Sequence, residues 1–134
     1  MIIDSSALIA ILRNESEGLS CAIAIEKASV RRISAVTFVE SAVVLDCSKD
    51  AVISRRFDQF IQEANIVIEA VTASQAQLAR EAYRDFGKGS GHTAKLNFGD
   101  CFSYALAKER KEPLLFVGSD FSHTDIEQAR NQTN

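Results

Sequence analysis

Short apolar runs alternate along this chain with longer stretches in which apolar residues recur every three or four positions. The short runs are typical of buried strands in a parallel sheet, and the longer stretches are typical of helices with one apolar side. The predicted strands are residues 1–3, 30–33, 65–71 and 114–117. The predicted helices are residues 7–12, 16–28, 35–48, 49–63, a helix that ends at 86 and is capped by Thr72 or Ser74, 98–110, and a short final helix capped by Thr124 or Asp125. This alternation predicts an α/β fold with a short, mostly parallel sheet of four or five strands, flanked by helices.

The length of 134 residues suits one domain with its own core, and we expect residues 1–134 to form a single domain. A hydrophobic content of 46% with 25% charged residues is ordinary for a globular protein. No apolar stretch approaches the roughly 20 residues that a membrane span needs. Asp4 interrupts the first apolar run almost at once, so no signal peptide is predicted. We therefore expect a cytoplasmic protein.

Three widely spaced cysteines, Cys21, Cys47 and Cys101, form neither a CxxC pair nor a zinc-like cluster with histidine. Cys21 and Cys101 lie among apolar helical positions, where a free cysteine acts as a small core residue. Reduced thiols agree with the expected cytoplasmic location.

A net charge of −3 and a pI near 5.4 argue against a broad surface for nucleic acid, because such surfaces carry clustered Lys and Arg. They do not exclude a nuclease, since part of the negative charge can belong to a metal site whose cation reverses the sign locally. Basic residues are concentrated at Arg31-Arg32, at Arg55-Arg56 and in a glycine-rich loop, residues 87–97. In this loop Lys88 and Lys95, with His92, are candidates to contact a nucleic-acid backbone. The alternative is a solvated loop.

Four acids stand at particular places along this pattern. Asp4 follows the first predicted strand, Asp120 follows the last one, Glu40 lies on a helix, and Asp100 opens another. Ligands bind parallel sheets beyond the carboxyl ends of the strands, where these acids can converge. Like charges that close repel, so the cluster requires cations or protons. Hard oxygen ligands favour Mg²⁺ or Mn²⁺.

Each acid also has a simpler explanation. Asp4 can be a helix cap, and Asp100 can interact favourably with the dipole of its helix. Asp120 can start a turn, and Glu40 can be a solvated helical residue. Their apolar neighbours favour partial burial, and a buried carboxylate needs a partner or a metal. Three hydroxyl residues near the same edge are candidates to position water or a phosphate oxygen, with capping or turn formation as the alternative: Ser5, Thr37 and Ser119.

Four segments together resemble PIN-domain ribonucleases, and specifically the VapC-type toxins of bacterial toxin–antitoxin pairs. They are IIDSSALIAIL at the N-terminus, TFVESAVVL around Glu40, KLNFGDCFSYALAK around Asp100, and PLLFVGSDFSHTDI around Asp120. The resemblance spans essentially the whole chain, with the motifs in the expected order. It implies a PIN-like three-layer sandwich.

The resemblance also implies a Mg²⁺- or Mn²⁺-dependent endoribonuclease, usually a homodimer, that a cognate VapB-type antitoxin inhibits. Asp4, Glu40 and Asp100 match the metal-binding acids of the family, and Asp120 is the best match to the fourth catalytic acid. Many relatives carry an acid where this chain has Gly118, and many close relatives carry Lys where it has Val117. The role of Asp120 is therefore the least regular.

In chemical terms, the sequence predicts hydrolysis of an RNA phosphodiester by a metal-activated water. A serine nucleophile is disfavoured because no paired histidine and acid accompany Ser5. The main alternative is a non-catalytic PIN-like binding module that acts through a partner complex. A small phosphatase or a receiver domain fits less well, because a receiver needs adjacent acids after its first strand, where Asp4 stands alone.

The antitoxin contact is predicted in a groove between the first two helices, which accepts an amphipathic partner helix. The residues proposed to line it are Leu8, Ile11, Leu12, Leu19 and Ile23. The alternative is that these side chains form the core of the domain.

Overall fold

The computed structural model describes residues 1–129 and contains a four-stranded sheet in which all strands run parallel. The strands are β1 (Ile2–Ile3), β2 (Arg32–Ser34), β3 (Val67–Glu69) and β4 (Leu114–Leu115), in the order β3-β2-β1-β4. The predicted parallel sheet is confirmed, with strands shorter than expected. The central strand β1 has only two residues, and it pairs with β4 through Ile2 and Leu114 and through Ile3 and Leu115.

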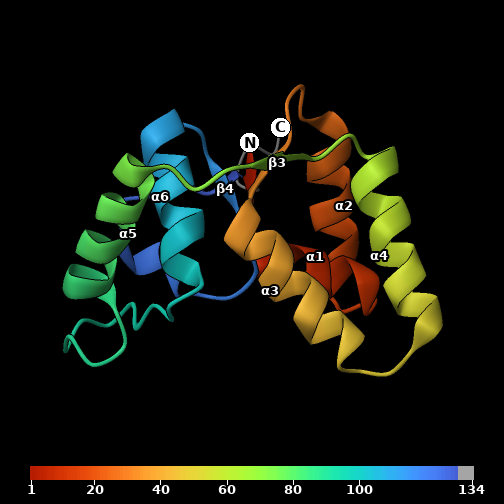
Figure 1. Cartoon of the computed structure of the whole chain (residues 1–134), viewed down its shortest axis with the longest axis horizontal. Helices are drawn as coiled ribbons and strands as arrows, with labels where there is room; N and C mark the ends of the chain where they lie inside the picture. The colour runs from red at the N-terminus through yellow and green to blue at the C-terminus, as the bar shows by residue number, and fades with distance from the viewer. Residues whose placement is uncertain (130–134) are drawn as a thin grey trace.

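Six α-helices cover the sheet, and they form two layers (Figure 1). Their bounds are α1 (Ser5–Leu12), α2 (Gly18–Lys27), α3 (Ala35–Asp46), α4 (Ala51–Glu63), α5 (Ala73–Phe86) and α6 (Asp100–Arg110). Helices α5 and α6 lie side by side on one side of the molecule, and α1, α2 and α4 lie on the other (Figure 1). The predicted three-layer α/β sandwich is confirmed.

Alternation along β1 divides the core between the two layers. Successive side chains of a strand point to opposite faces of the sheet. Ile2 therefore packs in the cluster formed with α5 and α6, whereas Ile3 packs in the cluster formed with α1, α2 and α4. Leu114 and Leu115 divide in the same way. These two pairs of residues join both cores at the centre of the sheet.

Side-chain caps begin several helices at the carboxyl edge of the sheet. Asp4 caps α1 by accepting a hydrogen bond from the backbone N–H of Ser6, and Ser34 caps α3 through Val36. Of the two predicted caps for α5, Thr72 takes this role. The Asp4 backbone N–H donates to the carbonyl of Leu115 at 2.9 Å, so the first acid is anchored to the last strand.

The alternative that Leu19 and Ile23 form the core is wrong, whereas Cys21 is buried as predicted. Leu19 is 74% exposed and Ile23 is also exposed, while Cys21 and Ile25 point into the core. Gly18 explains the rotation of the helix, because a Cβ there would lie 2.5 Å from the Ala10 carbonyl oxygen. Close approach of α2 to α1 at this glycine decides which side is buried.

The predicted final helix is also wrong in the described chain. A single 3₁₀ turn, Phe121–His123, precedes Thr124, and residues 124–128 are not helical. Asp125 instead accepts hydrogen bonds from the Tyr104 hydroxyl at 2.7 Å and from Lys108. These contacts tie the segment to α6. None of the helices within residues 1–129 has both the length and the apolar character that a bilayer crossing requires.

Candidate active site

Asp4 is held rigidly at the end of β1. Its side chain is only 2% exposed, and both of its oxygens accept hydrogen bonds. Oδ2 accepts from the Ser6 backbone N–H at 3.1 Å and from the Ser6 hydroxyl at 2.7 Å, and Oδ1 accepts from the Ser103 hydroxyl at 2.7 Å. A carboxylate buried to this degree is stable only with such partners. Asp4 is therefore both a helix cap and a fixed acid.

A chain of buried hydroxyls extends this support to other elements. Ser103 on α6 lies 3.0 Å from the Thr37 hydroxyl on α3, and both residues are fully buried. The Ser6 hydroxyl accepts from the Val117 backbone N–H at 3.0 Å. Asp4 thus connects α1, α3, α6 and the segment after β4.

Glu40 lies beside this network, on α3. Its Oε1 accepts a hydrogen bond from the Ser5 hydroxyl at 2.9 Å, which places the predicted Ser5 at the site. Burial raises the pKa of the Glu40 carboxyl, the Ser5 hydrogen bond opposes that rise, and the charge of Asp4 adds to it. The carboxylate packs on Gly99, where a Cβ would lie only 2.5 Å from the Glu40 Cδ. Glu40 therefore reaches the start of α6.

Asp100 is the first residue of α6, and the charges of the three other acids raise its pKa. Its Oδ2 accepts from the Asn97 backbone N–H at 2.9 Å. Burial raises its pKa to about 7, with further contributions from the charges of Asp4, Glu40 and Asp120 and an opposing one from the Asn97 hydrogen bond. The four predicted acids therefore form one electrostatic cluster at the carboxyl edge of the sheet.

Asp120 is the outermost member of the cluster. It is exposed, it precedes the 3₁₀ turn, and its side chain makes no capping hydrogen bond there. Two residues earlier, Gly118 adopts a φ of +98°, which favours glycine over other residues. The glycine that departs from the family pattern is therefore matched to its backbone conformation.

The donor set fits a hard divalent cation. Within residues 1–129, none of the four acids forms an ion pair with Lys, Arg or His, so mutual repulsion is not offset by protein cations. In the same range, no three Asp, Glu, His or Cys side chains are arranged to hold one ion. Shared coordination would therefore require these side chains to turn toward one another.

The remaining predicted residues lie around this cluster or away from it. Lys88 and Lys95 are exposed on the 87–97 loop, and neither forms an ion pair with the described residues. The loop has internal order: the Lys88 N–H donates to the Leu96 carbonyl at 2.8 Å, and the His92 Nδ1 accepts from the Ala94 N–H at 3.0 Å. Ser119 is exposed. Contact of these lysines with substrate stays a prediction.

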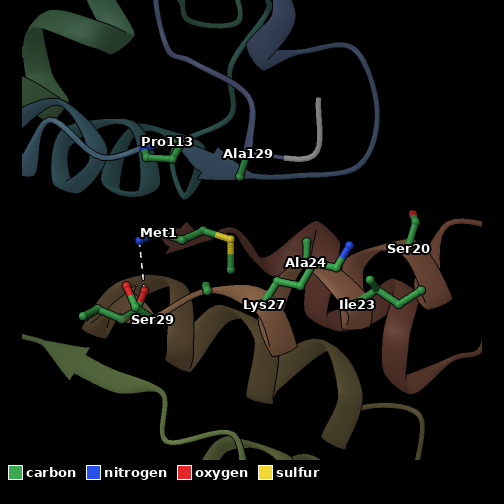
Figure 2. A pocket seen from close by; sticks show the side chains of 10 residues that line it. Met1, Ser20, Ile23, Ala24, Lys27, Ser29, Pro113 and Ala129 are labelled. Atoms are coloured by element: carbon green, nitrogen blue, oxygen red, sulfur yellow. Dashed lines mark hydrogen bonds between the residues drawn. The ribbon is translucent and has the colours of Figure 1, made fainter. Parts of the chain in front are cut away.

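Three supporting residues were not predicted from the sequence: Ser6, Gly99 and Ser103. Ser103 lies three residues after Asp100, a spacing that places both on the same side of a helix, and this signal could have found it. A cavity of about 510 Å³ lies elsewhere, at the start of β1, between Met1 and the α2 residues Ile23 and Lys27 (Figure 2). None of the four acids lines that cavity, so it is distinct from the acid cluster.

Comparison with known proteins agrees with this geometry. The PIN domain family model matches residues 1–127. Ribonuclease VapC28 of Mycobacterium tuberculosis is 57% identical over 129 residues, which cover 96% of this chain and 97% of that protein. Ribonuclease VapC42 of the same species is 46% identical over 129 residues, covering 96% of this chain and 98% of that protein.

Solved structures share the fold at low sequence identity. The crystal structure of Mycobacterium tuberculosis VapC20, described as a sarcin-ricin loop cleaving toxin, matches with a TM-score of 0.73 and 16% identity over 93% of this chain and 95% of that chain. A toxin–antitoxin complex from Klebsiella pneumoniae matches with a TM-score of 0.67 and 17% identity over 90% and 89% of the two chains. The chain belongs to the PIN domain family and, within it, to the VapC ribonucleases. The resemblance noted in the sequence is confirmed.

Proposed function

We propose that this chain is the toxin of a type II toxin–antitoxin pair, an endoribonuclease that hydrolyses RNA phosphodiester bonds with Mg²⁺ or Mn²⁺. Membership of the VapC ribonucleases supports the toxin and ribonuclease activity. The observation that carries the metal dependence is the coupling of Asp100 to three other acids without a basic partner among residues 1–129. A divalent cation offsets such a charge cluster better than any other common ligand.

Asp4, Asp100 and Glu40 would hold the metal, and Asp120 would complete the outer part of the site. A bound divalent ion supplies an activated water and polarises the phosphoryl oxygen. Ser6 and Ser103 keep the Asp4 oxygens in one orientation, and Ser5 orients Glu40. We assign substrate binding to Ser5, Lys88 and Lys95, with the two lysines contacting the RNA backbone. No covalent nucleophile is required.

The test is cleavage of RNA by the purified chain in Mg²⁺ or Mn²⁺, with EDTA as the metal-free control. Asp4→Asn and Asp100→Asn should each abolish cleavage, whereas Asp58→Asn, an exposed acid on α4, should leave it intact. Circular dichroism and thermal melts would verify that all variants fold. Cleavage that survives EDTA or both active-site substitutions would contradict the assignment. A folded chain that never cleaves RNA would favour the non-catalytic binding module.

The proposed partners are the RNA substrate, a cognate VapB-type antitoxin and a second copy of the chain, all in the cytoplasm. Leu8 and Leu12 are buried in the core, so they cannot line the predicted antitoxin groove. Leu19 and Ile23 on α2 remain available, because both are exposed apolar side chains. Leu19→Lys should weaken inhibition by the antitoxin without changing RNA cleavage. Unchanged inhibition would place the antitoxin elsewhere.

A further inference from the structure

A second cavity, of about 430 Å³, lies between α5 and the start of α6. The two helices lie side by side and are joined by the 87–97 loop (Figure 1). The cavity is lined by Ala76, Ala79, Arg80, Tyr83, Arg84, Phe98, Cys101 and Phe102. Phe98 and Cys101 flank Asp100 in the chain, so the cavity opens within two residues of a proposed metal ligand. This volume falls in the range of about 300–1,000 Å³ that is common for ligand sites.

Phe98 gives this cavity an exposed aromatic wall. Its side chain is 71% exposed, although a large apolar side chain is usually covered. The ring is nevertheless held in place, because it packs edge-on against Phe102 with centroids 5.1 Å apart. The opposite wall includes Tyr83, whose hydroxyl donates to the Lys88 carbonyl at 3.1 Å. Small alanines separate the walls and leave room for a planar ring.

Two exposed arginines at the rim line the cavity. Ala76, Arg80 and Arg84 recur every four residues and therefore lie on one side of α5, together with Tyr83. Arg84 pairs with Asp85 at 2.9 Å, which leaves Arg80 as the rim cation without an ion pair among residues 1–129. A guanidinium beside exposed aromatic rings is complementary to a nucleotide, which presents a flat base and an anionic phosphate.

We infer that this α5–α6 cavity binds a nucleotide of the RNA substrate next to the scissile phosphate. The base stacks on Phe98, and Arg80 contacts a backbone phosphate. The inference rests on the proposed ribonuclease function and extends it, because it names the surface that presents RNA to the acids. Stacking is tolerant of sequence, so this site would position single-stranded RNA without selecting one base.

The test measures RNA binding separately from cleavage. A 5′-fluorescein-labelled single-stranded RNA oligonucleotide of mixed sequence is titrated with Asp100→Asn protein, and binding is followed by fluorescence anisotropy. Adding Phe98→Ala should weaken binding about tenfold, and Phe98→Trp should preserve it. Arg80→Ala should weaken binding and lower the slope of log K against log salt by about 0.7. The matched controls Val39→Ala and Arg55→Ala, exposed residues on α3 and α4, should change neither quantity.

Two results would overturn the inference. One is unchanged RNA affinity in both Phe98→Ala and Arg80→Ala. The other is loss of a dimer in Phe98→Ala, measured by size-exclusion chromatography with light scattering, because the cavity would then be a contact between two copies of the chain. The proposed function is tested independently, by RNA cleavage with chains in which Asp100 is intact. Either of these results, found beside intact RNA cleavage by the wild-type chain, would remove the inference and keep the ribonuclease.

Discussion

Glu40 and Gly99 are in direct contact: the carboxylate of one occupies the space where a side chain of the other would begin. Gly99 has an ordinary helical backbone, with φ −62° and ψ −37°, so its backbone does not require glycine. The requirement is steric and comes from Glu40. Because Glu40 is a flexible side chain, it can move aside at little cost, but it then leaves the acid cluster.

Gly99→Ala should therefore reduce cleavage strongly while leaving the free energy of unfolding unchanged or raised by about 0.5 kcal/mol, since alanine restricts the unfolded chain. Single-turnover RNA cleavage and urea denaturation would measure the two effects. Gly18→Ala provides the contrast, because its Cβ would meet the immovable Ala10 carbonyl and should cost stability without disturbing the acids. Full activity in Gly99→Ala would mean that Glu40 does not need its present position.

Ser103→Ala should lower both Mg²⁺ affinity and cleavage, because Asp4 loses the hydrogen bond that fixes its Oδ1. The expected loss of stability is about 1–3 kcal/mol, the cost of leaving buried polar groups unpaired. Isothermal titration with Mg²⁺ and thermal melts would measure these changes. The matched control is Ser41→Ala, since the buried Ser41 hydroxyl donates to the Thr37 carbonyl at 2.8 Å and not to Asp4. Equal effects of both substitutions on Mg²⁺ affinity would show that the support is not specific to Asp4.

The metal-free protein should lose stability as the pH rises toward neutrality. Burial and neighbouring acids raise the pKa of Asp100 from 3.8 to about 7, so between these values the folded protein keeps a proton that the unfolded chain releases. Unfolding then releases a proton, and a higher pH favours it. Melting temperatures in EDTA should fall between about pH 5 and pH 8, and Asp100→Asn should flatten that slope. A slope that Asp100→Asn leaves as steep as before would place the titrating group elsewhere.

Gly118→Ala should lower the free energy of unfolding by about 1–2 kcal/mol, because its φ of +98° is strained for residues with a Cβ. Space is not the reason, since nothing lies within 4 Å of the position a Cβ would take. Gly118→Asp, which introduces an acid here, should carry the same cost. Denaturant titration against the exposed neighbour Ser119→Ala would measure it. Equal stability of all three variants would remove the conformational role of Gly118.

The sequence predicted the four strands and the six α-helices within residues 1–129, and it singled out the four acids, because these leave local signals. Asp4 and Asp100 each combine an apolar flank with a helix start, and the matching motifs fall in family order. The orientation of α2 left a weaker signal. Cys21 was predicted as a core residue, but apolar residues occur on more than one side of this helix, and the close contact at Gly18 leaves Leu19 and Ile23 exposed. Ser103 was missed for a similar reason. Its spacing from Asp100 is a local signal, but Asp4, the acid whose oxygen it contacts, lies 99 positions earlier.

The hydrogen bond from the Asp4 N–H to the Leu115 carbonyl has a consequence for protein synthesis. The ribosome makes Asp4 well before Leu115, and Val117, whose backbone N–H donates to the Ser6 hydroxyl, follows Leu115. Until Leu115 and Val117 have left the ribosome, the nascent chain lacks the partners that fix Asp4. Domains generally fold as units once their sequence has emerged. The contacts that fix Asp4 are therefore completed only after the segment that carries Leu115 and Val117 has been made.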